Sequence, residues 1–142
     1  MRKLDSTTVT KTDIPIKIIQ FGEGNFLRAF TNWMIDIMNA EHGYNHGVAI
    51  VQPIKKGMVE VLEKQDNLYH HISRGLKKGE ILTETRLIKC IQKSINPFKD
   101  IGAYIALALL DTLEIVISNT TESGIVFSDS EKEISELPNQ SQ

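Results

Sequence analysis

The sequence predicts an α/β fold built on a mostly parallel sheet, and three observations carry this prediction. An apolar run at 15–21 passes through two glycines, separated by one residue, directly into a stretch of helical periodicity. A second short apolar run at 47–53 completes a strand–helix–strand unit, whose crossover is expected to be right-handed. A third apolar run at 113–119 follows another helical stretch. Continuous apolar runs are typical of parallel strands covered on both faces, so we expect a Rossmann-like, doubly wound sheet.

The first strand and helix are the best defined elements. Proline and glycine bound the apolar run 15–21, as expected for a buried strand. The helix that follows is predicted to end near His42 and Gly43, where glycine can adopt the left-handed cap conformation. One broad apolar stripe marks its inner face: Phe26, Leu27, Phe30, Trp33, Met34, Ile37 and Met38.

The remaining elements follow in order along the chain. Residues 55–64 predict a short helix, and 98–110 predict an apolar one. Between them, 67–74 and 80–89 flank a glycine-containing loop and predict an inserted β-hairpin, placed at an edge of the sheet.

Composition fits one globular domain. We expect a polar N-terminal segment at 1–14, a nucleotide-binding domain at 15–128 and a flexible tail or linker at 129–142, where apolar residues are scarce. A net charge of −2 argues against general attraction to nucleic acid or to an anionic membrane surface. The polar start resembles no signal peptide, no run reaches the length of a membrane span, and Cys90 is the single cysteine. These features favour a cytoplasmic protein with a packed, structural thiol.

The Gly-x-Gly turn is the main candidate for function. Gly22 permits a tight turn, and Gly24 lets the backbone approach phosphate groups without a Cβ in the way. The amides of Asn25 and Phe26, at the helix start, would then face the pyrophosphate. A full fingerprint has a third glycine where this chain has Leu27, which predicts a slightly displaced helix.

Two further positions bear on the nucleotide. Arg28 lies in the first helical turn, where it could reach a phosphate or a second domain. Gln52 stands near the expected adenosine ribose, where NAD-binding folds usually place an acid. Lys55 and Lys56 follow it, as a solvated surface or as partners of a 2′-phosphate, so the pattern alone leaves NAD and NADP open.

A second polar cluster ends the strand predicted at 113–119. Asn119, Thr120 and Glu122 would lie near the nicotinamide end, because open α/β sheets bind ligands at the carboxyl ends of their strands. The alternative is a turn stabilised by its own side chains, but the glycine turn favours a cofactor contact.

Histidines and carboxylates give no metal site. Gly43 interrupts the helix between His42 and His46, and the adjacent His70 and His71 point to opposite sides of a strand. The scattered acidic residues are interpreted as surface charge.

Several blocks in one order resemble the N-terminal part of altronate oxidoreductases, also called tagaturonate reductases, within the mannitol dehydrogenase family. Outside the glycine turn, the resemblance rests on several separate short motifs that match in the same order along the chain. The matching blocks are 18–30, 33–36, 51–54, 57–59, 65–69, 85–88, 95–97 and 116–125.

The resemblance implies NAD(H) as cofactor and the interconversion of D-altronate and D-tagaturonate, a step of hexuronate catabolism. The family pattern also accepts a residue other than glycine at Leu27. In the family, a helical C-terminal domain supplies the catalytic lysine and most contacts to the sugar-acid substrate. No residue of this chain inherits that role, so we assign no catalytic residue and no metal, and expect the 142-residue chain to be a truncated, inactive piece.

Two alternative functions remain open, and the expected truncation has one further consequence. The chain could be a non-catalytic nucleotide-binding module, or part of a family member acting on fructuronate or mannitol. Apolar surface left without its second domain is expected to favour self-association.

Overall fold

The computed structural model describes residues 4–120, apart from the Lys77 side chain, and folds them around a four-stranded parallel sheet. The strands lie in the order β5-β2-β1-β6, and a separate two-stranded sheet pairs β3 with β4. The elements, in chain order, are β1 (Ile16–Phe21), η1 (Leu27–Thr31), α1 (Asn32–His42), β2 (Gly47–Val51), α2 (Val59–Glu63), β3 (Tyr69–Lys77), β4 (Glu80–Ile88), β5 (Ile91–Ile95), α3 (Ile101–Leu107) and β6 (Ile115–Ser118). The predicted α/β class with a parallel sheet and an inserted hairpin is confirmed.

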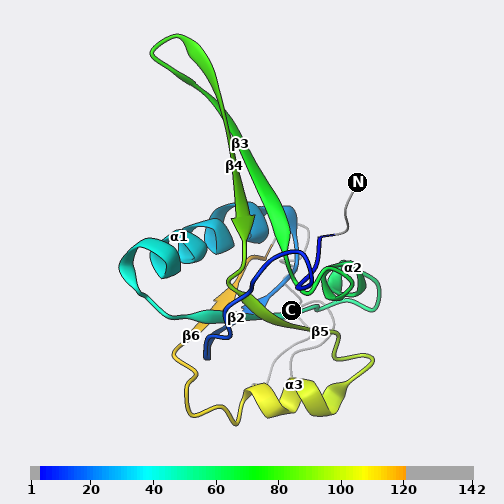
Figure 1. Cartoon of the computed structure of the whole chain (residues 1–142). Helices are drawn as coiled ribbons and strands as arrows, with labels where there is room; N and C mark the ends of the chain where they lie inside the picture. The colour runs from blue at the N-terminus through cyan, green and yellow to red at the C-terminus, as the bar shows by residue number, and fades with distance from the viewer. Residues whose placement is uncertain (1–3, 121–142) are drawn as a thin grey trace, which may run out of the picture.

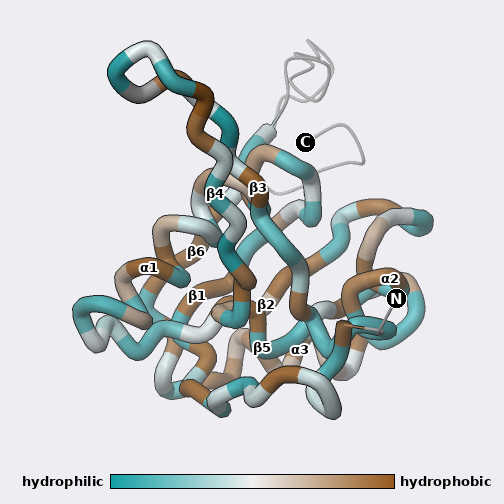
Figure 2. Tube along the Cα trace, turned by 45° about the horizontal axis from the view of Figure 1, so that its top comes forward, coloured by the Kyte–Doolittle hydropathy of each residue, from teal (hydrophilic) through white to brown (hydrophobic). Residues whose placement is uncertain are grey.

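Helices cover both faces of the parallel sheet, which makes it doubly wound (Figure 1). On one face, Ile35 of α1 and Leu62 of α2 pack on β1, β2 and β5 through Ile18, Val48, Ile50 and Ile91. On the other, Leu107 of α3 packs with Ile19, Ala49, Val51 and Ile95. Hydrophobic colouring runs through the central strands β1 and β2 (Figure 2). Both faces of these strands are therefore buried, as their continuous apolar sequences require.

The helix after the glycine turn begins with a π-helical segment, η1, and continues as α1. Leu27 opens this segment with a side chain only 4% exposed. A π turn is wider than an α turn, which leaves room for a leucine where the nucleotide-binding fingerprint has glycine. The helix ends as predicted at Gly43, which has a φ of 62° and donates its N–H to the Met38 carbonyl.

The predicted hairpin forms, but its surroundings differ from the prediction in two ways. It is not added to an edge of the parallel sheet, because within the described part of the chain β3 and β4 pair only with each other. In addition, the apolar run around Cys90 divides into β4, which ends at Ile88, and β5, which begins at Ile91 and joins the parallel sheet beside β2. The sequence analysis missed β5 as a strand of its own.

The hairpin projects from the body as an arm (Figure 1). Its residues are paired in register from Tyr69 with Ile88 to Lys77 with Glu80. Near the tip, Leu76 and Ile81 face each other and are 77% and 82% exposed. The base of the arm contacts the body, where the Trp33 ring of α1 lies 5.7 Å from the ring of His71.

Candidate dinucleotide-binding site

The predicted site residues gather where the parallel strands end. Phe21, the last residue of β1, is in register with Val51 of β2 and Ser118 of β6, so Gly22, Gln52 and Asn119 follow three neighbouring strands at one edge. The chain leaves β1 through α1 on one face and reaches β6 from α3 on the other. This reversal is the topological switch point at which open α/β sheets bind their ligands.

Gly22 has the conformation that its predicted role needs. Its φ of 105° lies in a region that L side chains rarely adopt, and both of its peptide groups are held. The N–H donates to the Val51 carbonyl over 2.9 Å, and the carbonyl accepts from Gln20 Nε2 over 2.8 Å. The turn is thus fixed by β2 on one side and by a buried β1 side chain on the other.

Gly24 leaves the outer side of the turn open. A Cβ built there meets no atom within 4 Å, so the space beside the backbone is free. The first helical hydrogen bond runs from the Arg28 amide to the Gly24 carbonyl over 3.2 Å. Within the described part of the chain, the amides of residues 23–27 donate no hydrogen bond. Consecutive free amides at a helix start form the kind of cradle that fits a pyrophosphate.

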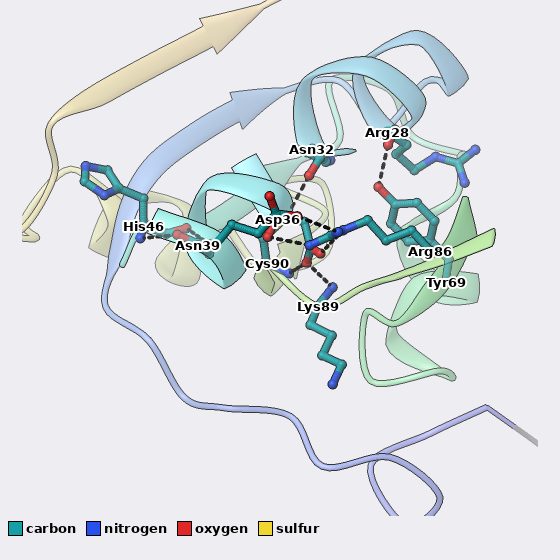
Figure 3. Close-up of polar contacts among 10 residues, drawn as sticks. Arg28, Asn32, Asp36, Asn39, His46, Tyr69, Arg86, Lys89 and Cys90 are labelled. Atoms are coloured by element: carbon teal, nitrogen blue, oxygen red, sulfur yellow. Dashed lines mark hydrogen bonds and ion pairs between the residues drawn. The ribbon is translucent and has the colours of Figure 1, made fainter. Parts of the chain in front are cut away.

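Arg28 folds back over the turn. Its Nε donates to the Glu23 carbonyl over 2.8 Å, and Nη2 donates to Asn25 Oδ1 over 2.6 Å. The guanidinium also lies over the Tyr69 ring, 5.7 Å from its centroid, and the Tyr69 hydroxyl donates to the Arg28 carbonyl over 2.7 Å (Figure 3). Burial raises the pKa of Tyr69, which keeps this hydroxyl a donor. Arg28 therefore brings a positive charge to the turn and braces it.

The next two predicted residues line the opening of the turn. Asn25 is exposed apart from its contact with Arg28. The Phe26 ring is 57% exposed and lies 5.4 Å from the Phe30 ring, on the outer side of the helix. Their backbone amides donate no hydrogen bond within the described residues, and their contact with a pyrophosphate remains a prediction.

Gln52 lies at the predicted place but its side chain is committed to the protein. The side chain is 1% exposed; Nε2 donates to the Ile54 carbonyl over 2.6 Å, and Oε1 accepts from the Val59 amide over 3.1 Å. These bonds shape the loop between β2 and α2, while Lys55 and Lys56 are exposed on it. The ribose contact of Gln52 remains a prediction.

The second polar cluster is described only in part. Asn119 and Thr120 are exposed directly after β6, at the same edge as the glycine turn. Glu122 lies outside the described residues, so its nicotinamide contact also remains a prediction.

Asp36 is one residue that the sequence analysis misjudged. The expectation that the acidic residues are surface charge is wrong here, because this carboxylate is 7% exposed. Its Oδ1 accepts from the amides of Lys89 and Cys90 over 2.7 and 3.1 Å, and Oδ2 accepts from Arg86 Nε over 2.8 Å (Figure 3). It thereby joins α1 to the corner between β4 and β5. The blocks 33–36 and 85–88, which carry part of the family resemblance, thus contact each other through Asp36 and Arg86.

Cys90 is confirmed as a packed thiol. It is 2% exposed, its Sγ contacts the Asn32 carbonyl oxygen at 3.4 Å, and burial raises its pKa, so the reactive thiolate is disfavoured.

The histidines give no metal site within the described residues. His46 Nε2 is bound to Glu114 over 2.8 Å, next to Lys17 near the start of β1, at the opposite edge from the glycine turn. Among the described residues no three His, Cys, Asp or Glu are placed to hold a metal ion. Of the helices in residues 4–120, none is long and apolar enough to cross a membrane.

Known proteins share both the sequence and the fold. A family model described as the mannitol dehydrogenase Rossmann domain matches residues 16–140. Altronate oxidoreductases of Bacteroides thetaiotaomicron and Bacillus subtilis are 46% and 44% identical to the chain over 127 residues, which is 89% of this chain and 26% of each relative. The chain therefore spans about a quarter of the length of these curated relatives.

Solved structures agree with this match. Pseudomonas fluorescens mannitol 2-dehydrogenase, in a ternary complex with NAD and D-mannitol, superposes with a TM-score of 0.70 at 26% identity, over 85% of this chain and 25% of that one. A substrate-free D-sorbitol dehydrogenase gives the same TM-score of 0.70 at 21% identity, over 87% of this chain and 28% of that one, and supports the fold.

Proposed function

Since the chain belongs to the mannitol dehydrogenase family and forms its Rossmann domain, we propose that it is the NAD(H)-binding part of an oxidoreductase that interconverts D-altronate and D-tagaturonate. One observation supports the cofactor assignment: among the described residues the amides of residues 23–27 have no acceptor, and they surround an open Gly24 at the switch point of the sheet. The identity of 46% with an altronate oxidoreductase supports the substrate.

The turn binds the cofactor's pyrophosphate in this proposal. Gly22 sets the turn, Gly24 admits the phosphates, and the amides of Asn25 and Phe26 donate to them. The dipole of the helix and the charge of Arg28 add attraction for the anion. Gln52 lies near the adenosine ribose, and Asn119, Thr120 and Glu122 lie near the nicotinamide.

In this proposal, this part of the enzyme holds and orients the cofactor. When bound, the nicotinamide supplies the hydride that reduces the ketone carbon of the substrate. The residues around Gly22 and after β6 hold the cofactor by its two ends at the edge of the sheet. The proton is delivered by a basic residue from a helical domain beyond these residues, so the 142-residue chain is expected to bind NAD(H) without turning over tagaturonate.

The test is a titration of the purified chain with NADH, followed by nicotinamide fluorescence and by calorimetry. Saturable binding is the expected result, and a folded chain that binds no NADH would contradict the proposal. Enzyme-dependent oxidation of NADH with tagaturonate, assayed on the same sample, would show that the chemistry does not need a second domain.

A polyol substrate is the second candidate, favoured by the likeness to mannitol 2-dehydrogenase. The identity to that enzyme is 26%, against 46% to the altronate oxidoreductase, and we therefore prefer the sugar acid. A longer version that carries the second domain would decide between them when assayed with tagaturonate, fructuronate and mannitol in parallel.

A further inference from the structure

Glu23, between the two glycines of the turn, is a buried carboxylate that the roles given above do not use. It is 7% exposed, and its Oε1 lies against Gly57, in the loop that follows β2. A Cβ built on Gly57 would overlap Glu23 Oε1 and would stand 2.7 Å from Gln52 Oε1. The carboxylate from the end of β1 thus lies with the Gln52 side chain at the end of β2.

Within the described residues the Glu23 carboxylate has no hydrogen bond or ion pair, and its oxygens are not among the side-chain atoms that are fully closed off from solvent without a partner. Asp36, equally buried, shows what such a group normally has: two amide donors and an arginine. Burying a carboxylate is costly unless it is paired, so an unpaired one requires an explanation. Its position beside the proposed cofactor edge suggests that the missing donor belongs to the ligand.

The end of the second strand is where NAD-binding folds place an acid that accepts from the adenosine ribose. Here Gln52 follows that strand, and its side-chain amide is already bonded to Ile54 and Val59. Glu23 brings a carboxylate to the same place from the adjacent strand. We propose that Glu23 is the acceptor for the adenosine ribose hydroxyls of NAD(H) and the residue that rejects the 2′-phosphate of NADP(H).

This inference rests on the proposed function and makes it more specific. The exposed Lys55 and Lys56 are the charges nearby in sequence that would favour a 2′-phosphate. Salt and water screen exposed charges, whereas a buried carboxylate acts through a less polar medium. Glu23 is therefore expected to outweigh the two lysines, and the site is expected to select NADH.

The experiment measures NADH and NADPH affinities of the 142-residue chain, wild type and Glu23→Gln. The substitution keeps the shape and removes the charge. A hydrogen bond to a charged group gives roughly a 10- to 100-fold effect, so we expect the preference for NADH over NADPH to fall by about that factor. Glu63→Gln, an exposed carboxylate on α2, is the matched control and should leave the preference unchanged.

The outcomes separate this inference from the proposed function. A wild-type chain that binds neither nucleotide contradicts the cofactor site itself. A wild-type chain that binds NADH while Glu23→Gln keeps the same preference, or loses both nucleotides equally, contradicts the role of Glu23 alone. If Glu23→Gln does not fold by circular dichroism, Glu23→Asp takes its place: the shortened carboxylate should weaken NADH binding and still exclude NADPH, and a gain of NADPH binding would overturn the inference.

Discussion

Gln20 Nε2 donates to the carbonyl oxygen of Gly22 over 2.8 Å from a side chain with no exposed surface. In a trans peptide the N–H points opposite to the C=O. By drawing the Gly22 carbonyl inward, Gln20 turns the Glu23 amide outward, toward the open side of the turn. A central strand residue thus presets the orientation of the first free amide of the proposed phosphate cradle.

Gln20→Met is expected to weaken NADH binding by roughly 2- to 10-fold, because a neutral hydrogen bond that orients the turn is lost. Stability should change little, since the substitution also removes Gln20 Oε1, a buried oxygen without a partner among the described residues. Fluorescence titration and urea denaturation measure the two effects. Asn39→Leu, which removes a side-chain amide bonded to His46 at the opposite edge of the sheet, is the control and should leave NADH affinity intact.

The two glycines of the turn are expected to respond differently to alanine. Gly22→Ala places a side chain at a φ of 105° and should lower the free energy of unfolding by about 1–3 kcal/mol. Gly24→Ala has free space and should leave stability unchanged, or raise it by up to about 1 kcal/mol, while obstructing the phosphates. NADH titration and denaturation of both variants check this, with Gly75→Ala in the hairpin as control. Equal NADH affinity of Gly24→Ala and wild type would contradict the phosphate role.

Asp36→Asn is expected to lower the free energy of unfolding by about 1–3 kcal/mol, because the charge-assisted bonds to Arg86, Lys89 and Cys90 are weakened together. Glu41→Gln is the matched control: its carboxylate is exposed and 3.7 Å from Arg86 Nη1, so its loss should cost less than about 1 kcal/mol. Urea denaturation measures both, and equal losses would argue against a special role of Asp36.

Alkaline pH is expected to destabilise the chain through Cys90. Burial raises the pKa of this thiol in the folded state above its ordinary value of 9.0. The unfolded chain therefore releases the proton first, and stability that is complete below pH 9.0 declines as the pH rises above it. Denaturation from pH 7 to 10.5 should show less of this decline in Cys90→Ala. Native protein should also react slowly with a thiol reagent, and rapid labelling would mean that the thiol is accessible.

Self-association is expected from an apolar line along the outer side of α3 and the turn that follows it. Ile101, Ile105 and Leu109 are 58%, 55% and 77% exposed, at helical spacing. Sedimentation over a wide concentration range should show dimers or larger species that decrease in Ile105→Lys. A monodisperse wild-type monomer throughout would contradict this expectation.

The sequence predicted the elements that local pattern determines. β1, the glycine turn, the following helix and its end at Gly43 all have a residue-level signal in the right place. The division of the run at 80–95 into β4 and β5 has no such signal. It depends on Asp36, more than fifty positions away, which binds the amides of Lys89 and Cys90 and turns the chain between the two sheets.

At the candidate site, too, contacts between residues distant in sequence could not be predicted from local pattern. Gln52 could be placed at the end of the second strand from the apolar run before it. That its amide is used by Ile54 and Val59, and that Glu23 reaches the same place, depends on how the loop at 53–58 folds back. Glu23 stands inside the Gly-x-Gly motif, but the pattern accepts any residue at this position and therefore gives no signal for it.

The arm formed by β3 and β4 has a consequence for how the molecule moves. Among residues 4–120 its strands pair only with each other, so the arm is expected to open and close without disturbing the parallel sheet. Amide deuterium exchange should therefore divide the chain into a slow body and a fast arm. The turn at Lys78 and Gly79, with φ angles of 54° and 86°, is then a natural point of attachment for a reporter that leaves the nucleotide edge undisturbed.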